Sequence, residues 1–294
     1  MTFDWRKATD EDIERHFNPR VAVADAGDHI ARFTGSAAKA RGQLAGRYDI
    51  AYGGPADAGE KMTLDLFPAR NADLGSPAPV QVFIHGGFWR ALDKSDHSFA
   101  ALDITAWGIA HISLNYDLCP TVTLDDIVGQ MRKALAYVYN HADELGIDKN
   151  RIHLAGHSAG AHLAAMLLCM DWAEAGLPAD VVKGVAALSG IYEPEAVMHT
   201  SVNADLHLDL AMAARNDVIA MAPINKAKML ITVGGDEPEG WRKQSSDYAE
   251  VCRVAGLDTE VMIVPGTHHF TVLDAAVTAG TPSFEAIVAQ IAAS

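Results

Sequence analysis

The sequence predicts an α/β protein in which a mostly parallel sheet of eight strands carries helices on both faces. Short apolar runs rich in β-branched residues alternate along the chain with longer segments of helical periodicity, and this alternation is typical of parallel sheets. Several of the apolar runs end in glycine-rich turns. With 294 residues, 49% of them hydrophobic, the chain can bury a large core as one domain over residues 1–294.

Each predicted element follows from its own pattern. The strand-like runs are 47–52, 61–67, 79–84, 109–115, 151–155, 183–189, 228–234 and 259–265. Helical spacing of apolar residues predicts helices over 124–145, 159–170, 241–254 and 283–292. Residues 1–45 precede the first strand and form an N-terminal helical extension, whereas residues 191–222 lack a strand pattern and are expected to form a small helical cap.

The most informative motif is Gly156-His157-Ser158-Ala159-Gly160, which joins the strand at 151–155 to the helix at 159–170. A serine on such a turn is how α/β hydrolases present a nucleophile, and the flanking glycines let strand and helix approach closely. The alternative is an ordinary glycine-rich turn. The context on both sides favours Ser158 as a nucleophile.

A second motif, His85-Gly86-Gly87-Phe88-Trp89, directly follows the strand at 79–84. Acyl transfer develops negative charge on a carbonyl oxygen, and backbone N–H groups aimed at that oxygen lower the barrier. We predict an oxyanion hole made by Gly87 or Phe88 together with Ala159. His85 is expected to pin this loop by hydrogen bonding rather than to act as a second base.

A nucleophilic serine needs a histidine base and a carboxylate that orients it, in the chain order serine, acid, histidine. The strand at 228–234 is followed by Asp236 and Glu237, and the strand at 259–265 is followed by His268 and His269. The pattern alone leaves both choices open. This chemistry requires no cofactor and no metal ion.

These motifs resemble those of kynurenine formamidase (arylformamidase), an α/β hydrolase, and of its bacterial relatives near the hormone-sensitive-lipase-like esterases. The two glycine motifs carry the resemblance, together with Ser113-Leu114-Asn115-Tyr116 before Pro120 and with Phe17-Asn18-Pro19-Arg20 near the N-terminus. Formamidases often have tyrosine where this chain has Phe88. The lost hydroxyl bears on the fine substrate specificity.

The resemblance also implies which residues form the triad. The family's acid lies close to a proline, which favours Glu237 over Asp236, and its base directly precedes an aromatic residue, which favours His269 over His268. In relatives, N-terminal helices help to close the acyl pocket. The alternative for residues 1–45 is that they only pad the fold or form a homodimer contact.

Three aromatic side chains are expected to contact a substrate or, alternatively, to pack in the core: Trp89, Tyr116 and Phe270. The favoured function is a serine hydrolase that cleaves an N-formyl aromatic amide such as N-formylkynurenine, as the resemblance implies. A general short-acyl carboxylesterase needs the same residues and is not separated by them. A noncatalytic ligand-binding protein of the same fold would be indicated by a missing triad member, and each member has a candidate.

Charge and composition exclude several kinds of partner. The formal net charge is −15, from 38 acidic and 23 basic residues, which opposes binding to nucleic acid or to anionic membranes. The charged N-terminus lacks the apolar region of a signal peptide, and no apolar run is long enough to cross a bilayer. Three scattered cysteines fit reduced thiols. We therefore expect a cytoplasmic enzyme with a small-molecule substrate, which could form a homodimer.

Overall fold

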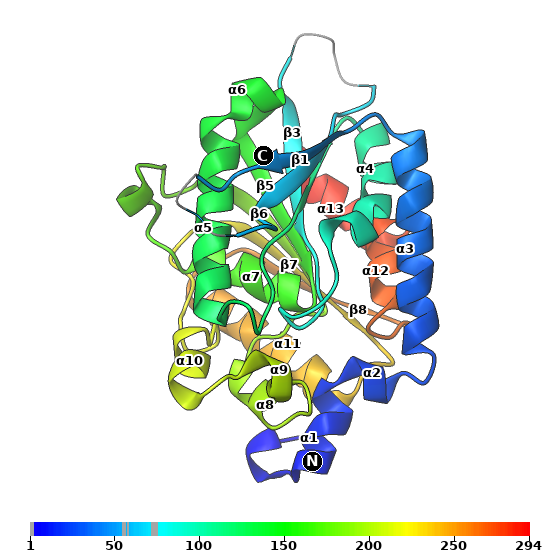
Figure 1. Cartoon of the computed structure of the whole chain (residues 1–294), viewed down its shortest axis with the longest axis vertical. Coiled ribbons are helices and arrows are strands. Elements are labelled where there is room, and N and C mark those ends of the chain that lie inside the picture. Colours follow the sequence, from blue (N-terminus) through cyan, green and yellow to red (C-terminus); the bar gives the residue numbers. More distant parts are fainter. Residues whose placement is uncertain (1–2, 55–56, 58, 72–75) are drawn as a thin grey trace.

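The computed structural model describes residues 3–54, 57, 59–71 and 76–294. Its eight-stranded sheet has the order β1-β2-β4-β3-β5-β6-β7-β8, and helices cover both faces (Figure 1). β2 pairs antiparallel with β1 and with β4, and the remaining neighbours are parallel. The predicted α/β class with its mostly parallel sheet is confirmed.

All eight predicted strands are present among the described residues. They are β1 (Arg47–Ala51), β2 (Thr63–Phe67), β3 (Ala78–Ile84), β4 (Ala110–Leu114), β5 (Ile147–His157), β6 (Val182–Leu188), β7 (Lys228–Gly234) and β8 (Thr259–Val264). The largest difference is at β5, which begins at Ile147 instead of residue 151. Its first residues include the polar run Asp148-Lys149-Asn150, which lacks the apolar pattern that predicted the other strands.

The helices fall into three groups along the chain. The N-terminal group is η1 (Trp5–Lys7), α1 (Asp10–Phe17), α2 (Pro19–Ala22) and α3 (Ala26–Gln43). The second group comprises the helices outside the N-terminal segment and the β6–β7 connection: η2 (Lys94–Ala100), α4 (Ala101–Ala106), α5 (Leu124–Asn140), α6 (Ala142–Leu145), α7 (Ala159–Leu168), η3 (Trp172–Ala175), α11 (Glu239–Val254), α12 (Thr271–Val277) and α13 (Pro282–Ala292). Between β6 and β7 lie α8 (Pro194–Met198), α9 (Asn203–Leu206) and α10 (Leu210–Arg215).

The core has two layers, one on each face of the sheet. Along β3, Val82 and Ile84 face the cluster that contains α5, α7 and α11, whereas Phe83 faces the cluster that contains α3, α12 and α13. This alternation is the two-residue period of a strand. Every residue of α7 is buried, which explains its alanine-rich composition.

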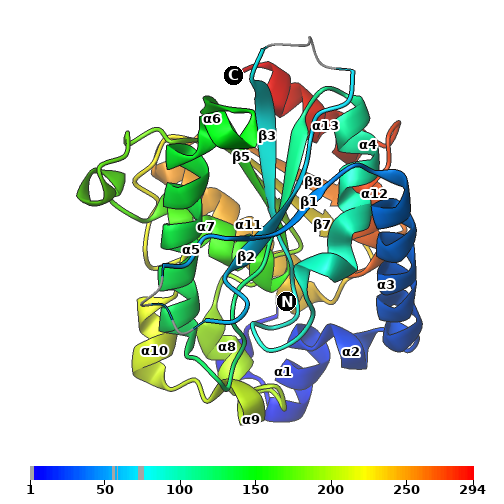
Figure 2. The ribbon, with the colours of Figure 1, turned by 45° about the horizontal axis from the view of Figure 1, so that its top comes forward.

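Helices α1 and α2 lie at one end of the sheet, with α1 next to α8 and α9, whereas α3 runs along the side of the molecule beside α4 and α12 (Figure 2). α1 is docked on α11: the rings of Phe17 and Trp241 have centroids 6.3 Å apart, and the Gly240 N–H donates to His16 Nδ1 at 3.0 Å. The start of the N-terminal extension is therefore packed onto the end of the sheet at which β5 and β7 terminate.

None of the helices in the described part of the chain has both the length and the apolar character of a membrane span.

Candidate active site

Ser158 lies on a tight turn between β5 and α7. Its φ of 57° and ψ of −119° are a strained combination for a residue with a side chain. A Cβ at Gly156 would collide with the Gly160 carbonyl, and a Cβ at Gly160 would collide with the Ile84 carbonyl of β3. The two glycines of the motif therefore allow α7 to begin directly against β3 and β5.

The loop that is predicted to form the oxyanion hole, here called the oxyanion loop, directly follows β3. It has three consecutive residues with positive φ: Gly87 (109°), Phe88 (52°) and Trp89 (54°). Gly87 and Phe88 line the same cavity as Ser158. Ala159 is the first residue of α7, and N–H groups of the first helical turn have no partner within the helix. The Ala159 N–H therefore has no carbonyl partner inside α7.

Glu237 and His269 form a buried pair. Glu237 Oε2 lies 3.1 Å from His269 Nδ1, and the two side chains are 1% and 6% exposed. The Gly234 N–H donates to the other carboxylate oxygen at 2.7 Å. A carboxylate accepts hydrogen bonds, so the arrangement places a proton on His269 Nδ1 and leaves Nε2 able to accept one.

Asp236 and His268, the alternatives for acid and base, occupy a different place. Asp236 is exposed, and both residues, like Glu237 and His269, line a neighbouring cavity of about 120 Å³. Neither lines the cavity that contains Ser158. The geometry therefore pairs Glu237, and not Asp236, with the histidine that shares a cavity with Ser158.

Ser189 is a site residue that the sequence analysis missed. It directly follows β6, has a φ of 48° and is fully buried. Its hydroxyl lies 2.6 Å from Glu237 Oε2 and 2.8 Å from His269 Nδ1. One hydroxyl can donate to the carboxylate while it accepts from the imidazole. Since β6 lies between β5 and β7, a serine at its carboxyl end was the available signal.

Two further histidines, His97 and His157, line the cavity beside Ser158, and both are neutral. His157 Nε2 donates to the His269 carbonyl at 2.7 Å. Burial, and then the neighbouring His269, hold the pKa of His157 well below its usual value. Burial, and then His85, lower the pKa of His97 to about 4. His97 therefore adds no positive charge to the cavity wall near neutral pH.

The cavity next to Ser158 is narrow, about 40 Å³. One wall is built from the N-terminal helices, by the residues Pro19, Arg20, Ile30 and Phe33. Among the described residues, none from 191–222 lines it. That segment is helical as expected, but the structure closes this cavity with α2 and α3.

The three aromatic residues expected at the substrate have different positions. Phe270 lines the cavity. Trp89 is fully buried and packs edge-on against His162, with ring centroids 5.0 Å apart. Tyr116 is fully buried and donates its hydroxyl to the His85 carbonyl at 2.8 Å. Trp89 and Tyr116 therefore pack in the core, because both side chains are shielded from solvent and neither lines the cavity.

Two other polar regions of the described chain hold titratable side chains. Ligand atoms of Asp25, His29 and His268 lie within 4.8 Å of one another, but the Nδ1 atoms of both histidines already accept hydrogen bonds, at 3.2 and 3.3 Å. An open groove of about 870 Å³ contains Cys119. Burial, followed by Asp126, raises the pKa of this thiol to about 11, so it is a poor nucleophile.

Known proteins resemble this chain over most of its length. A profile of the BD-FAE family matches residues 64–206. Kynurenine formamidase of Salmo salar is 29% identical over 285 residues, with 92% of each chain covered. The enzyme of that name from Danio rerio is 29% identical over 286 residues, again with 92% of each chain covered.

Solved structures agree with these relatives. A candidate thioesterase from Silicibacter superposes with a TM-score of 0.79 at 29% identity, covering 96% of this chain and 99% of the other. The esterase of Pyrobaculum calidifontis has the same fold, with a TM-score of 0.71 at 18% identity and 97% and 96% of the chains covered. The chain therefore has the α/β-hydrolase fold and is similar over most of its length to enzymes of the arylformamidase and esterase group, which supports a serine hydrolase that acts on an amide or an ester.

Proposed function

We propose that this serine hydrolase uses Ser158, His269 and Glu237 as its catalytic triad and that its favoured substrate is an N-formyl aromatic amide. The observation that carries the triad is the Glu237–His269 pair at 3.1 Å beside a cavity that both His269 and Ser158 line. Ser189 completes the hydrogen bonding of this pair.

The mechanism follows from the protons that these atoms hold. Ser158 Oγ attacks the formyl carbon as His269 Nε2 takes the serine proton. Glu237 stabilises the imidazolium, and the N–H groups of Ala159 and of Gly87 or Phe88 bind the oxyanion. The C–N bond then breaks, and His269 gives its proton to the departing aryl amine. Water, deprotonated by His269, then attacks the formyl carbon of the serine ester; the C–O bond to Ser158 breaks, His269 returns the proton to Ser158 Oγ, and formate leaves.

Two features support a formyl amide as substrate. The cavity beside Ser158 is only about 40 Å³, which suits a one-carbon acyl group better than a long chain. Its wall includes three aromatic rings, those of Phe33, Phe88 and Phe270, which can pack against an aryl leaving group. The relatives named kynurenine formamidase cover 92% of this chain and support the same choice.

A short-acyl carboxylesterase is the second candidate. It is favoured by Phe88, which replaces a family hydroxyl with a purely apolar ring on the cavity wall. The separating experiment measures kcat/KM for N-formylkynurenine and for 4-nitrophenyl acetate on one preparation. We expect the formyl amide to be preferred. A preference for the ester would replace the proposed substrate class and leave the triad in place.

A further inference from the structure

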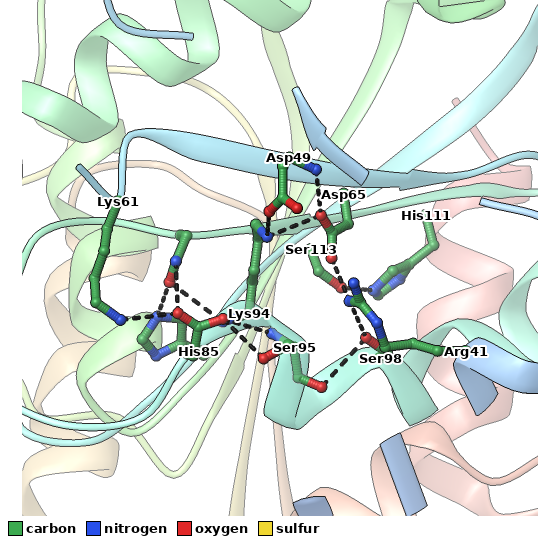
Figure 3. Close-up of polar contacts among 12 residues, drawn as sticks. Arg41, Asp49, Lys61, Asp65, His85, Lys94, Ser95, Ser98, His111 and Ser113 are labelled. Atoms are coloured by element: carbon green, nitrogen blue, oxygen red, sulfur yellow. Dashed lines mark hydrogen bonds and ion pairs between the residues drawn. The ribbon is translucent and has the colours of Figure 1, made fainter. Parts of the chain in front are cut away.

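A chain of buried polar side chains leads from the oxyanion loop to Lys61 (Figure 3). His85 Nε2 lies 3.0 Å from Asn115 Oδ1. Asn115 Nδ2 donates to Asp93 Oδ2 at 2.8 Å, and Lys61 Nζ donates to the same oxygen at 2.8 Å. His85 and Asn115 are 0% and 3% exposed, so this chain is sheltered from water at the loop.

The orientation of the Asn115 amide is fixed by its neighbours. The Lys94 backbone N–H donates to Oδ1 at 3.2 Å, and the Asp93 carboxylate accepts from Nδ2. Burial raises the pKa of Asp93, but hydrogen bonds from Lys61, from the Ser95 N–H and from Asn115 outweigh it, and the pKa lies well below its usual value. If the amide were flipped, its NH₂ group would face the Lys94 N–H and its oxygen would face the Asp93 carboxylate, and neither contact is a hydrogen bond. Asn115 therefore always presents its oxygen to His85.

His85 and Tyr116 in turn hold the peptide that precedes Gly87. Burial lowers the pKa of His85, so the ring is neutral; its one proton is on Nε2, toward Asn115, and Nδ1, 2.8 Å from the Gly86 carbonyl, has none to donate. The ring stacks on Tyr116, with centroids 4.3 Å apart, and the Tyr116 hydroxyl donates to the His85 carbonyl at 2.8 Å and lies 3.4 Å from the Gly86 carbonyl. In a planar trans peptide, the carbonyl of Gly86 and the N–H of Gly87 point in opposite directions. Holding the Gly86 carbonyl beside Tyr116 therefore turns the Gly87 N–H away from these rings, and Gly87 lines the cavity with Ser158.

We propose that Asn115 and Asp93 are positioning residues for the oxyanion hole. They hold the His85 ring, and His85 together with the stacked Tyr116 fixes the Gly86–Gly87 peptide, whose N–H faces the developing negative charge. Neither residue touches the substrate. The inference rests on the proposed role of Gly87 as an oxyanion donor, and it assigns Lys61 the part of fixing Asp93 from the partly exposed end.

The polar side chains drawn in Figure 3 also include a buried carboxylate, Asp65, that can serve as a control for loss of stability. Lys94 Nζ pairs with Asp65 at 2.9 Å and with Asp49 at 2.6 Å, and Arg41 also pairs with Asp65. These pairs tie α3 and η2 to β2 (Figure 3). Asp65 is as buried as His85, but its carboxylate makes none of the contacts that hold the oxyanion loop. Asp65→Asn should therefore lower stability without a specific effect on catalysis.

The experiment compares Asn115→Leu with Asp65→Asn. Asparagine and leucine have nearly the same shape, but leucine cannot accept from His85 Nε2 or donate to Asp93. With 4-nitrophenyl acetate, we expect kcat to fall about 10- to 100-fold in Asn115→Leu, below the full effect of deleting an oxyanion donor, while KM changes less than about twofold. The affinity for an aryl trifluoromethyl ketone, which forms an oxyanion on the serine, should fall by a similar factor.

A milder variant keeps the test independent of folding. Lys61 is 37% exposed, so Lys61→Met should fold and show a smaller loss of the same kind, whereas Lys61→Arg should retain kcat. The proposal is overturned if kcat/KM falls without a parallel loss of ketone affinity, or if Asp65→Asn gives the same kinetic change. If the ketone does not inhibit the wild-type enzyme, the serine mechanism itself fails. The aryl ester makes the test independent of the preference for formyl amides.

Discussion

At the residue scale, the hydroxyl of Ser158 is the group on which the proposed chemistry depends. Ser158→Ala removes the nucleophile and one oxygen atom from a turn whose backbone is set by Gly156 and Gly160. We expect kcat to fall by several orders of magnitude with little change in melting temperature. Steady-state kinetics and thermal unfolding on one preparation check both. A folded variant that retains more than about a tenth of wild-type kcat would exclude Ser158 as the nucleophile.

The neighbouring carboxylates Asp236 and Glu237 should differ sharply. Glu237→Gln removes the charged acceptor 3.1 Å from His269 Nδ1, and we expect kcat to fall on the order of 10²- to 10⁴-fold. Asp236 is exposed, so Asp236→Asn serves as the matched control and should keep most of the activity. The opposite ranking, measured on folded proteins with one substrate, would give the acid role to Asp236.

Ser189 offers a finer test of how His269 is held. Its hydroxyl contacts both members of the pair, but the direct contact between Glu237 and His269 remains when the hydroxyl is removed. Ser189→Ala should therefore lower kcat by less than about tenfold, in line with one hydrogen bond of about 1 kcal/mol. A loss as large as that of Glu237→Gln would mean that the hydroxyl, and not the direct contact, connects acid and base.

The difference between Glu237 and Ser189 also shows what the sequence could predict of the site. Motif position was enough to pair Glu237 with His269 as candidates. Ser189 was visible only as a serine at the carboxyl end of a strand, since its role depends on β6 lying between β5 and β7. Tyr116 shows the converse: the motif drew attention to it, but only the structure reveals that its hydroxyl points at the His85 carbonyl.

At the scale of elements, replacing a glycine by alanine should have opposite effects on stability in α5 and in α7. In α7, Gly160 has no room for a Cβ because the Ile84 carbonyl blocks it. In α5, Gly129 is exposed and has open space around it. Gly129→Ala should raise the free energy of unfolding by about 0.5–1 kcal/mol, whereas Gly160→Ala should lower it. Urea unfolding of the two variants checks the signs, and a destabilised Gly129→Ala would contradict the assigned environment.

Element boundaries were predictable where local chemistry decides them. Helix α5 begins where Thr123 and Asp126 form a reciprocal capping box, a signal carried by neighbouring residues. Its end was not predictable: the helix expected over 124–145 is divided at His141, whose φ of −107° and ψ of 19° are not helical. The apolar spacing continues through the break, so periodicity alone could not reveal it.

At the scale of the whole molecule, buried neutral histidines make stability depend on pH. Burial is the first cause that lowers the pKa of His111 to about 3 and those of His97, His153 and His162 to about 4. Unfolded histidines titrate near 6.5, so between about pH 6.5 and 4 the unfolded chain binds more protons than the native one. Stability is full above this window and is lost as the pH falls through it.

Each of these histidines should contribute up to about 1.4 kcal/mol per pH unit within the window. Urea unfolding at pH 7, 6 and 5 measures the slope. His111→Gln should reduce the slope, whereas His207→Asn, a change at an exposed position with positive φ, should leave it unchanged. Equal stability at pH 7 and pH 5 would contradict the neutral state of the buried rings.

The docking of α1 on α11 has a consequence for protein synthesis. His16 and its partner Gly240 are 224 residues apart in the chain, and Ile13 and Phe17, which are buried in the folded protein, come from that same first helix. A ribosome that adds about 5–20 residues per second needs roughly ten seconds or more to reach α11 after α1 has emerged. During that interval the apolar face of α1 lacks its partner on α11 and can be bound by chaperones, and no active enzyme exists until synthesis is nearly finished.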